Sequence, residues 1–211
     1  MIPVTILALR YLDNVSSDLA EALGAKDGCR CFGLLTTDCD DATYIALDEA
    51  TKAAEVQVSY GRSFYAGAAN ASTPNAGEVI GILSGATPAS VRSGMEAAVT
   101  ALEQIGFEET CGVPYLAHTV SSCGSYLAEL AGVRTGSALS YLIAPPLESM
   151  YAMDAALKAA DVRLCKLFAP PSETNFGGGL LSGTRSACEA ACAAFAEAVA
   201  EVAGRPKGET T

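Results

Sequence analysis

The chain has 211 residues and a mass of 21.5 kDa, which is enough for one large domain or two smaller ones. Half of the residues are hydrophobic and 18% are charged, so the composition predicts a packed core and excludes general disorder. The net charge of −11 argues against a nucleic-acid partner, because duplex binding requires clustered basic side chains.

The sequence predicts neither a membrane span nor an export signal. No apolar run approaches the roughly 18 residues that a spanning helix needs, and the opening MIPVTILALRYLDN lacks a basic start and a cleavage site. We therefore expect the eight cysteines to be free thiols in a reducing cytosol. Neither Cys29/Cys31 nor Cys188/Cys192 has the CxxC spacing of zinc or iron–sulfur sites, so we expect no bound metal or cofactor.

An internal repeat predicts two tandem domains. ALDEATKAAEVQV at 46–58 returns as AMDAALKAADVRL at 152–164, which matches Asp48 with Asp154 and Lys52 with Lys158. SDLAEALG and SYLAELAG precede these blocks, and GILSG and GLLSG follow them. Three matched blocks in one order indicate a duplication. We place the first domain at residues 1–108 and the second at 109–211.

Each copy is predicted to contain the same succession of strands and helices. In the first copy the expected order is a strand at 4–11, a helix at 17–23, a strand at 31–36, the Ala-rich helix of the matched block, strands at 56–58 and 78–83, and a helix at 88–104. In the second it is a strand at 115–120, a helix at 125–131, a strand at 139–144, the Ala-rich helix, strands at 162–164 and 180–181, and a helix at 186–203.

The two copies differ mainly in two loops. The first copy has TTDCDD at 36–41 where the second has APPLES, and its stretch 59–80 is longer than the matching 165–178. On a repeated scaffold, loops of this kind carry the specialised function.

These motifs resemble a known family. The helix pattern D-x-x-x-K-A-A-x-V and the strand G-[IL]-L-S-G are similar to the bacterial microcompartment shell domain, and two copies with an additional opening strand and helix resemble its circularly permuted tandem form. DCDDATYIALDEATKAAEV, YGRSFYAGAANAST and PPSETNF further resemble shell proteins of ethanolamine-utilisation compartments. The resemblance implies an α/β (α+β) fold in which each domain is a small, mainly antiparallel sheet flanked by helices.

The resemblance also implies a non-catalytic, structural role in the microcompartment shell, within the bacterial cytoplasm. The protein would form a pseudohexagonal homotrimer, contact other shell proteins, and have a gated central pore for metabolite or cofactor transport. The residues implied for the gate lie in the loops where the copies differ: Arg62, Phe64, Tyr65, Gly67, Asn175, Phe176, Gly177 and Gly178. Glycine-rich loops permit the backbone changes of a two-position gate, although surface loops without such a role have similar sequences.

A smaller acidic pore in each subunit is implied as well. There Asp40 and Glu78 would bind ethanolamine, and Phe107 would add a contact. The chemistry is reasonable, because ethanolamine carries an ammonium group at neutral pH and carboxylates accept hydrogen bonds from it. The alternative for DCDD is an acidic turn that is simply solvated.

Three other functions are alternatives to this interpretation of the sequence. An enzyme is the weakest, because the sole histidine, His118, lies in a predicted strand and no GxSxG, GxxxxGK[ST], GxGxxG or HExxH motif is present. A small-molecule sensor built from tandem repeats is a second alternative, and it would stop at a small oligomer. A shell protein of a propanediol-type compartment is the third.

Overall fold

The computed structural model describes residues 1–65, 75 and 77–208. The chain forms two compact units. The unit that we call the N-terminal unit comprises Pro3–Gly106 and Gly124–Leu127, and the C-terminal unit comprises Met1–Ile2, Phe107–Cys123 and Ala128–Thr211.

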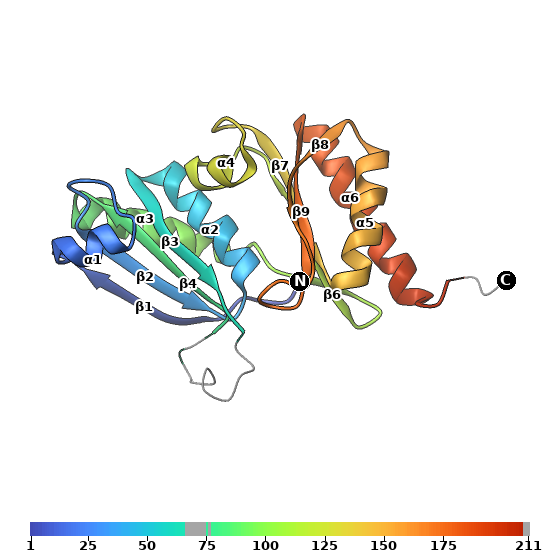
Figure 1. Cartoon of the computed structure of the whole chain (residues 1–211), viewed down its shortest axis with the longest axis horizontal. Helices are drawn as coiled ribbons and strands as arrows, with labels where there is room; N and C mark the ends of the chain where they lie inside the picture. The colour runs from blue at the N-terminus through green and yellow to red at the C-terminus, as the bar shows by residue number, and fades with distance from the viewer. Residues whose placement is uncertain (66–74, 76, 209–211) are drawn as a thin grey trace. The chain divides into compact units, whose positions relative to one another are not determined.

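The N-terminal unit is an antiparallel sheet in the order β1-β2-β4-β3 with helices on both faces (Figure 1). Along the chain its elements are β1 (Ile6–Leu12), α1 (Ser17–Ala22), β2 (Cys31–Thr37), α2 (Asp40–Ala53), β3 (Val56–Ser63), β4 (Val79–Gly85) and α3 (Pro88–Leu102). The start of α3 follows from its sequence, because Pro88 fits the first helical turn and the Thr87 hydroxyl accepts the Ser90 N–H at 3.1 Å.

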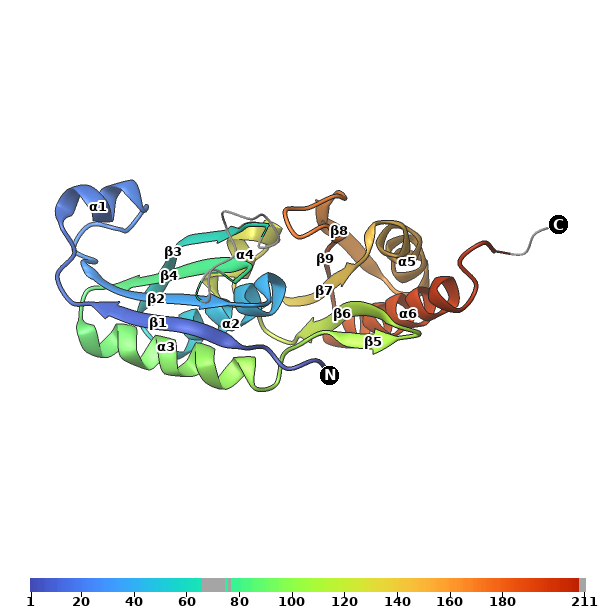
Figure 2. The same ribbon diagram turned by 90° about the horizontal axis from the view of Figure 1, so that it is seen from below.

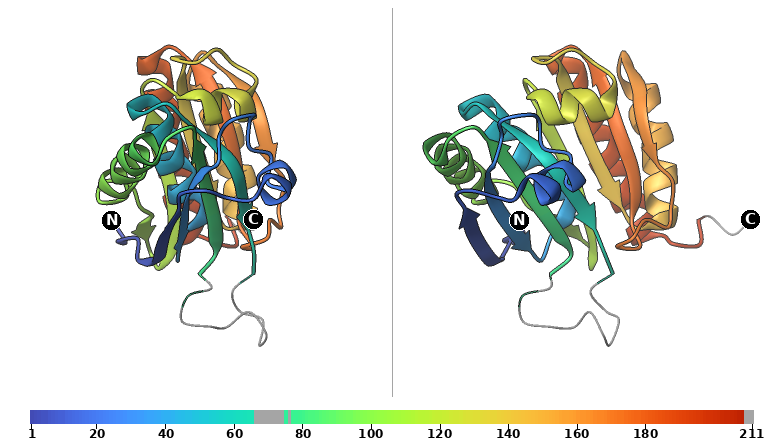
Figure 3. Two further views of the ribbon diagram at one scale, coloured as in Figure 1. Left: turned by 90° about the vertical axis from the view of Figure 1, so that its left-hand side faces the viewer. Right: turned by 60° about the vertical axis from the view of Figure 1, so that its left-hand side comes forward.

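Successive side chains of each strand point to opposite faces of the sheet, so each face packs against its own helices. A Cβ on Gly81 would stand 2.5 Å from Leu47 Cδ1, so glycine lets α2 approach β4 closely. On the opposite face Phe32 and Ile82 pack in one cluster with Ala20 of α1. The left view of Figure 3 shows the sheet between α1 on one side and α2 and α3 on the other, and Figure 2 shows α3 lengthwise along its face.

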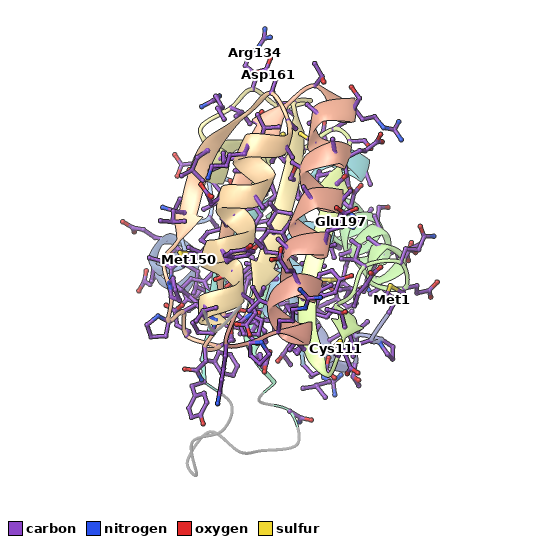
Figure 4. The ribbon with its side chains drawn as sticks, turned by 90° about the vertical axis from the view of Figure 1, so that its right-hand side faces the viewer. Met1, Cys111, Arg134, Met150, Asp161 and Glu197 are labelled. Carbon is purple, nitrogen blue, oxygen red and sulfur yellow. The ribbon has the colours of Figure 1, made fainter. Side chains whose placement is uncertain are left out.

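The C-terminal unit repeats this plan with one extra strand, in the order β5-β6-β7-β9-β8. Its elements are β5 (Glu108–Thr110), β6 (Val113–Val120), α4 (Ser125–Ala131, whose first turn belongs to the N-terminal unit), β7 (Ala138–Ala144), α5 (Pro146–Ala159), β8 (Val162–Phe168), β9 (Gly177–Gly183) and α6 (Arg185–Gly204). Helices α5 and α6 lie side by side, with Met150 on α5 and Glu197 on α6 (Figure 4), and they cover a core that includes Leu142, Ala156 and Phe195.

The structure confirms the repeated fold in detail. The register of β3 shifts between Val58 and Tyr60, and that of β8 shifts at the matched residues, Leu164 and Lys166. Three predictions were imprecise: β3 and β8 run several residues further, β9 begins at Gly177 rather than Leu180, and the short β5 was missed. Among the described residues no helix is long and apolar enough to cross a membrane.

A buried carboxylate joins α2 to the start of α4 within the N-terminal unit. Asp48 is fully buried and accepts the backbone N–H groups of Gly124 at 2.6 Å and Leu127 at 2.8 Å. Thr51, one turn on, accepts the N–H of Ser125 at 3.0 Å. Burial raises the pKa of Asp48, and the two backbone hydrogen bonds oppose that rise. Asp48 therefore supplies the cap that α4 lacks in its own sequence.

We expect Asp48→Ala to lower the free energy of unfolding by about 3 kcal/mol, because two buried N–H groups lose their acceptor. The matched control is Asp154→Ala, since the Asp154 side chain is 62% exposed and paired with Lys158. That control should change stability by less than about 0.5 kcal/mol. Urea unfolding of both variants makes the comparison, and equal losses would contradict the capping role.

Candidate functional site

The acidic segment DCDD forms the turn between β2 and α2, and two buried threonines fix it. The hydroxyls of Thr37 and Thr43 are 2.7 Å apart, and the Thr43 hydroxyl donates to the Cys39 carbonyl at 2.7 Å. Helix α2 consequently begins at Asp40, with Asp40 and Asp41 in its first turn. The partial positive charge of a helix N-terminus favours negative groups at this place.

Asp40 is a buried carboxylate with polar neighbours. It is only 6% exposed, its Oδ1 accepts the Asp41 N–H at 2.9 Å, and it is hydrogen-bonded to the Ser63 hydroxyl at the end of β3. Burial raises the pKa of Asp40, and the hydrogen bonds from Ser63 and the Asp41 backbone counteract this rise. Acidic side chains are rarely buried without partners, so these donors explain how Asp40 is tolerated.

Glu78 is held beside this turn by its own backbone. Its N–H donates to the Thr37 carbonyl at 2.8 Å, and its carbonyl accepts the Phe64 N–H at 3.0 Å. The preceding Gly77 has a φ of +61°, and a Cβ there would lie 2.1 Å from the Thr37 oxygen, so only glycine fits. Burial, followed by the negative charges of Asp40 and Asp38, raises the pKa of Glu78 to about 7.

The arrangement is suited to binding a cation. Asp40 is close enough to raise the pKa of Glu78, and Asp38, whose Oδ1 accepts the Thr5 N–H at 2.7 Å, adds a third negative charge. A bound cation would relieve this repulsion. Burial raises the pKa of Cys39, as do Asp41 and Asp40, so the thiol stays protonated and is a poor nucleophile or metal ligand.

No group of three or more potential metal-ligating side chains occurs within the ranges that the structure describes. Of the eight cysteines, four are buried: Cys31, Cys123, Cys188 and Cys192. Cys111 is exposed at the turn between β5 and β6 (Figure 4), and His118 is half-buried in β6 opposite Tyr141.

The structure brings together two of the three predicted ethanolamine-site residues. Asp40 and Glu78 belong to the N-terminal unit, whereas Phe107 belongs to the C-terminal unit. The Phe107 ring packs edge-on against Phe176 with centroids 5.4 Å apart, and its carbonyl accepts the Ile2 N–H. Ser63 was not predicted as a site residue, because only the fold brings the end of β3 to the start of α2.

The first set of predicted gate residues begins within the last residues of β3, at Arg62, and continues beyond the strand. Arg62 is exposed, and its guanidinium lies 5.4 Å from the centroid of the Tyr60 ring. Phe64 is half-buried and Tyr65 is 57% exposed. Gly67 lies outside the described residues.

The second set lies between β8 and β9, in a loop with its own hydrogen bonds. The Ser172 N–H donates to the Phe176 carbonyl at 2.9 Å, and the Asn175 N–H donates to the Ser172 carbonyl at 3.0 Å. Gly177 and Gly178 are already part of β9 and pair with β7. A Cβ on Gly178 would stand 1.9 Å from the Leu142 oxygen, so this glycine serves close strand packing.

Comparison with known proteins agrees with this architecture. A model of the BMC domain matches residues 31–113. The chain is 57% identical to the bacterial microcompartment shell protein EutL of Clostridium perfringens (strain 13 / Type A), over 99% of this chain and 98% of that protein. It is 47% identical to EutL of Escherichia coli (strain K12), over 98% and 96%.

Solved structures of EutL proteins also resemble this chain. The crystal structure of ethanolamine utilization protein EutL from Leptotrichia buccalis C-1013-b has a TM-score of 0.94 and 58% identity, over 98% of this chain and 97% of that one. The trimeric shell protein PduB, with a TM-score of 0.79 and 18% identity over 95% and 90% of the two chains, shows the fold alone.

Two shell-domain folds in one chain define a tandem bacterial microcompartment shell protein. With 57% identity over almost its whole length, the chain belongs to the EutL family of these shell proteins. Its role is therefore that of a structural component of the microcompartment shell, and the predicted resemblance to ethanolamine-utilisation shell proteins is confirmed.

We expect Glu78→Gln to stabilise the protein at pH 8 more than at pH 5. The pKa of Glu78 in the folded state, about 7, is above its ordinary value of 4.5, so the carboxyl weakens folding as pH rises through that interval. Glutamine cannot ionise, so it removes this destabilisation. Thermal unfolding at both pH values, with Glu109→Gln at an exposed position as control, measures the change in stability. An equal change at pH 5 and pH 8 would contradict the raised pKa of Glu78.

Proposed function

We propose that this shell subunit binds ethanolamine in the acidic site of its N-terminal unit and assembles into a trimer with a gated central pore. The observation that carries the binding proposal is the pair of half-buried and buried carboxylates, Glu78 and Asp40, held by backbone contacts beside the start of α2. Such a pair favours a small cation over a neutral or anionic solute.

Two considerations support ethanolamine as the cation bound at this site. Its ammonium group supplies three hydrogen-bond donors, enough to serve both carboxylates at once. The structurally similar protein from Leptotrichia buccalis is described as an ethanolamine utilization protein, which supports the same solute for this chain. Binding requires no general acid or base, so the proposal involves no catalysis.

The proposed trimer follows from the number of shell domains. Closed rotational symmetry is the usual state of homo-oligomers, and three chains with two domains each make a pseudohexagonal unit. Such a unit can tile with other shell proteins, whereas a sensor would not need to. The pore on the threefold axis would serve metabolites or cofactors larger than ethanolamine.

For the gate we propose residues from both loops in which the copies differ. The loop before β9 is held by its Ser172 hydrogen bonds and by the contact of Phe176 with Phe107, so Asn175, Phe176, Gly177 and Gly178 would form one part of the pore wall. Arg62 at the end of β3, with Phe64 and Tyr65 after it and Gly67 outside the described residues, would form the other part. The glycine- and alanine-rich sequence of this segment permits the backbone change of a gate.

We expect Asp40→Asn to weaken ethanolamine binding tenfold or more at pH 8, because a charge-assisted hydrogen bond is lost. Titration calorimetry with ethanolamine measures it. Asp154→Asn, at an exposed position of the second copy, is the control and should bind like the wild type. An unchanged affinity in Asp40→Asn would exclude the proposed site.

The mass of the purified protein in solution tests the assembly. Light scattering should find a species of about three times 21.5 kDa, or larger sheet-like material. A monomer at all concentrations would argue against the trimer and would favour a sensor.

A further inference from the structure

A chain of hydroxyl groups lies behind Asp40. The Tyr44 and Ser63 hydroxyl oxygens are 2.7 Å apart, and the Ser63 hydroxyl is also hydrogen-bonded to the Asp40 carboxylate. An ionised carboxylate only accepts hydrogen bonds, so Ser63 gives its single proton to Asp40 and accepts the proton of Tyr44. The chain therefore runs in one direction, from Tyr44 through Ser63 to Asp40.

Packing fixes the tyrosine at the start of this chain. Tyr44 lies one turn after Asp40 on α2, and its ring centroid is 6.1 Å from that of Tyr126. A Cβ on Gly61 would stand 3.1 Å from the Tyr126 hydroxyl and 3.2 Å from the Tyr44 ring, so glycine leaves room for both rings. Tyr126 in turn lies in the turn of α4 that Asp48 caps.

We propose that Ser63 and Tyr44 are positioning residues of the acidic site, a relay that holds Asp40 ionised and oriented for an amine ligand. This inference rests on the proposed ethanolamine site and adds to it the residues that position its carboxylates. Asp40 is the anion that the relay and the helix N-terminus hold in place, and Glu78, held beside the turn by its own backbone hydrogen bonds, is the second carboxylate that the amine contacts.

Several acidic or neutral groups of the described residues act on this site. They include Cys39 and Asp41 on either side of Asp40, Tyr44 on the same helix, Ser63 from β3, and Glu78 ahead of β4, with Asp38 acting on Glu78. Burial raises the pKa of Tyr44, so its hydroxyl remains a donor at neutral pH. Loss of the relay thus leaves Asp40 easier to protonate.

The second copy supports the assignment by contrast. Through the matched blocks, Asp40, Tyr44 and Ser63 correspond to Pro146, Met150 and Ala169. All three polar groups are missing there together, as expected if they act as one unit. In the first copy they occur on two elements and meet at one point.

The test is the pH dependence of ethanolamine binding, measured by calorimetry from pH 5.5 to 8.5. For Ser63→Ala we expect ethanolamine affinity to fall several-fold more at pH 5.5 than at pH 8.5, because Asp40 without its hydroxyl donor is protonated more readily. Tyr44→Phe, which keeps the ring contact with Tyr126, should produce a smaller loss of the same kind. Ser63→Thr should restore the wild-type profile.

Two controls separate the relay from the site itself. Ser59→Ala removes another half-buried β3 hydroxyl, one that donates to the Ile82 carbonyl, and it should leave the profile unchanged. Carbon-13 NMR titration of the Asp40 carboxyl without ligand should show an upward shift of its midpoint in Ser63→Ala and a smaller one in Tyr44→Phe. Unmoved midpoints in both relay variants, with binding still lost in Asp40→Asn, would overturn the relay alone. Intact binding in Asp40→Asn would overturn the site.

Discussion

The structure of the N-terminal unit depends on the burial of a polar stripe along α2. Asp40, Tyr44 and Asp48 follow one another at four-residue spacing, so they lie on one side of the helix on successive turns. Two of them are buried carboxylates, which need donors from outside the helix. Those donors come from the end of β3 and from the backbone at the start of α4, so the positions of both segments are tied to α2.

The same stripe shows how a duplicated scaffold acquired different roles in its two copies. Asp48 and Asp154 occupy matched positions, yet Asp48 is fully buried as a cap and Asp154 is exposed. The partner lysines differ accordingly. Lys158 pairs with Asp154 one turn away, whereas Lys52 pairs with Glu49. Identical residues in aligned repeats therefore do not imply identical functions.

Much of the fold could be predicted from the sequence because the repeat presents most strands and helices twice, in two different sequences with the same pattern. Alternation and apolar spacing located most strands and helices within a few residues. The start of β9 was missed because glycines suggest a loop, and only their pairing with β7 in the folded sheet shows that they belong to a strand. The hairpin strand β5 is three residues long, too short for any periodicity.

The candidate site was predictable only in part. The resemblance singled out Asp40 and Glu78, and the structure places them together. The roles of Ser63 and of Asp48, which caps α4 through the N–H groups of Gly124 and Leu127, could not be found in this way, because they depend on tertiary contacts between residues far apart in the chain. The strong rise in the pKa of Glu78 is likewise a product of burial and neighbouring charge, which no local pattern encodes.

The most direct test of the central claim is a crystal structure of the protein with ethanolamine at pH 8. The account predicts the amine nitrogen within hydrogen-bond distance of both Asp40 and Glu78, with Ser63 still bonded to Asp40. Ethanolamine bound elsewhere, with these two carboxylates facing only solvent or protein groups, would contradict it.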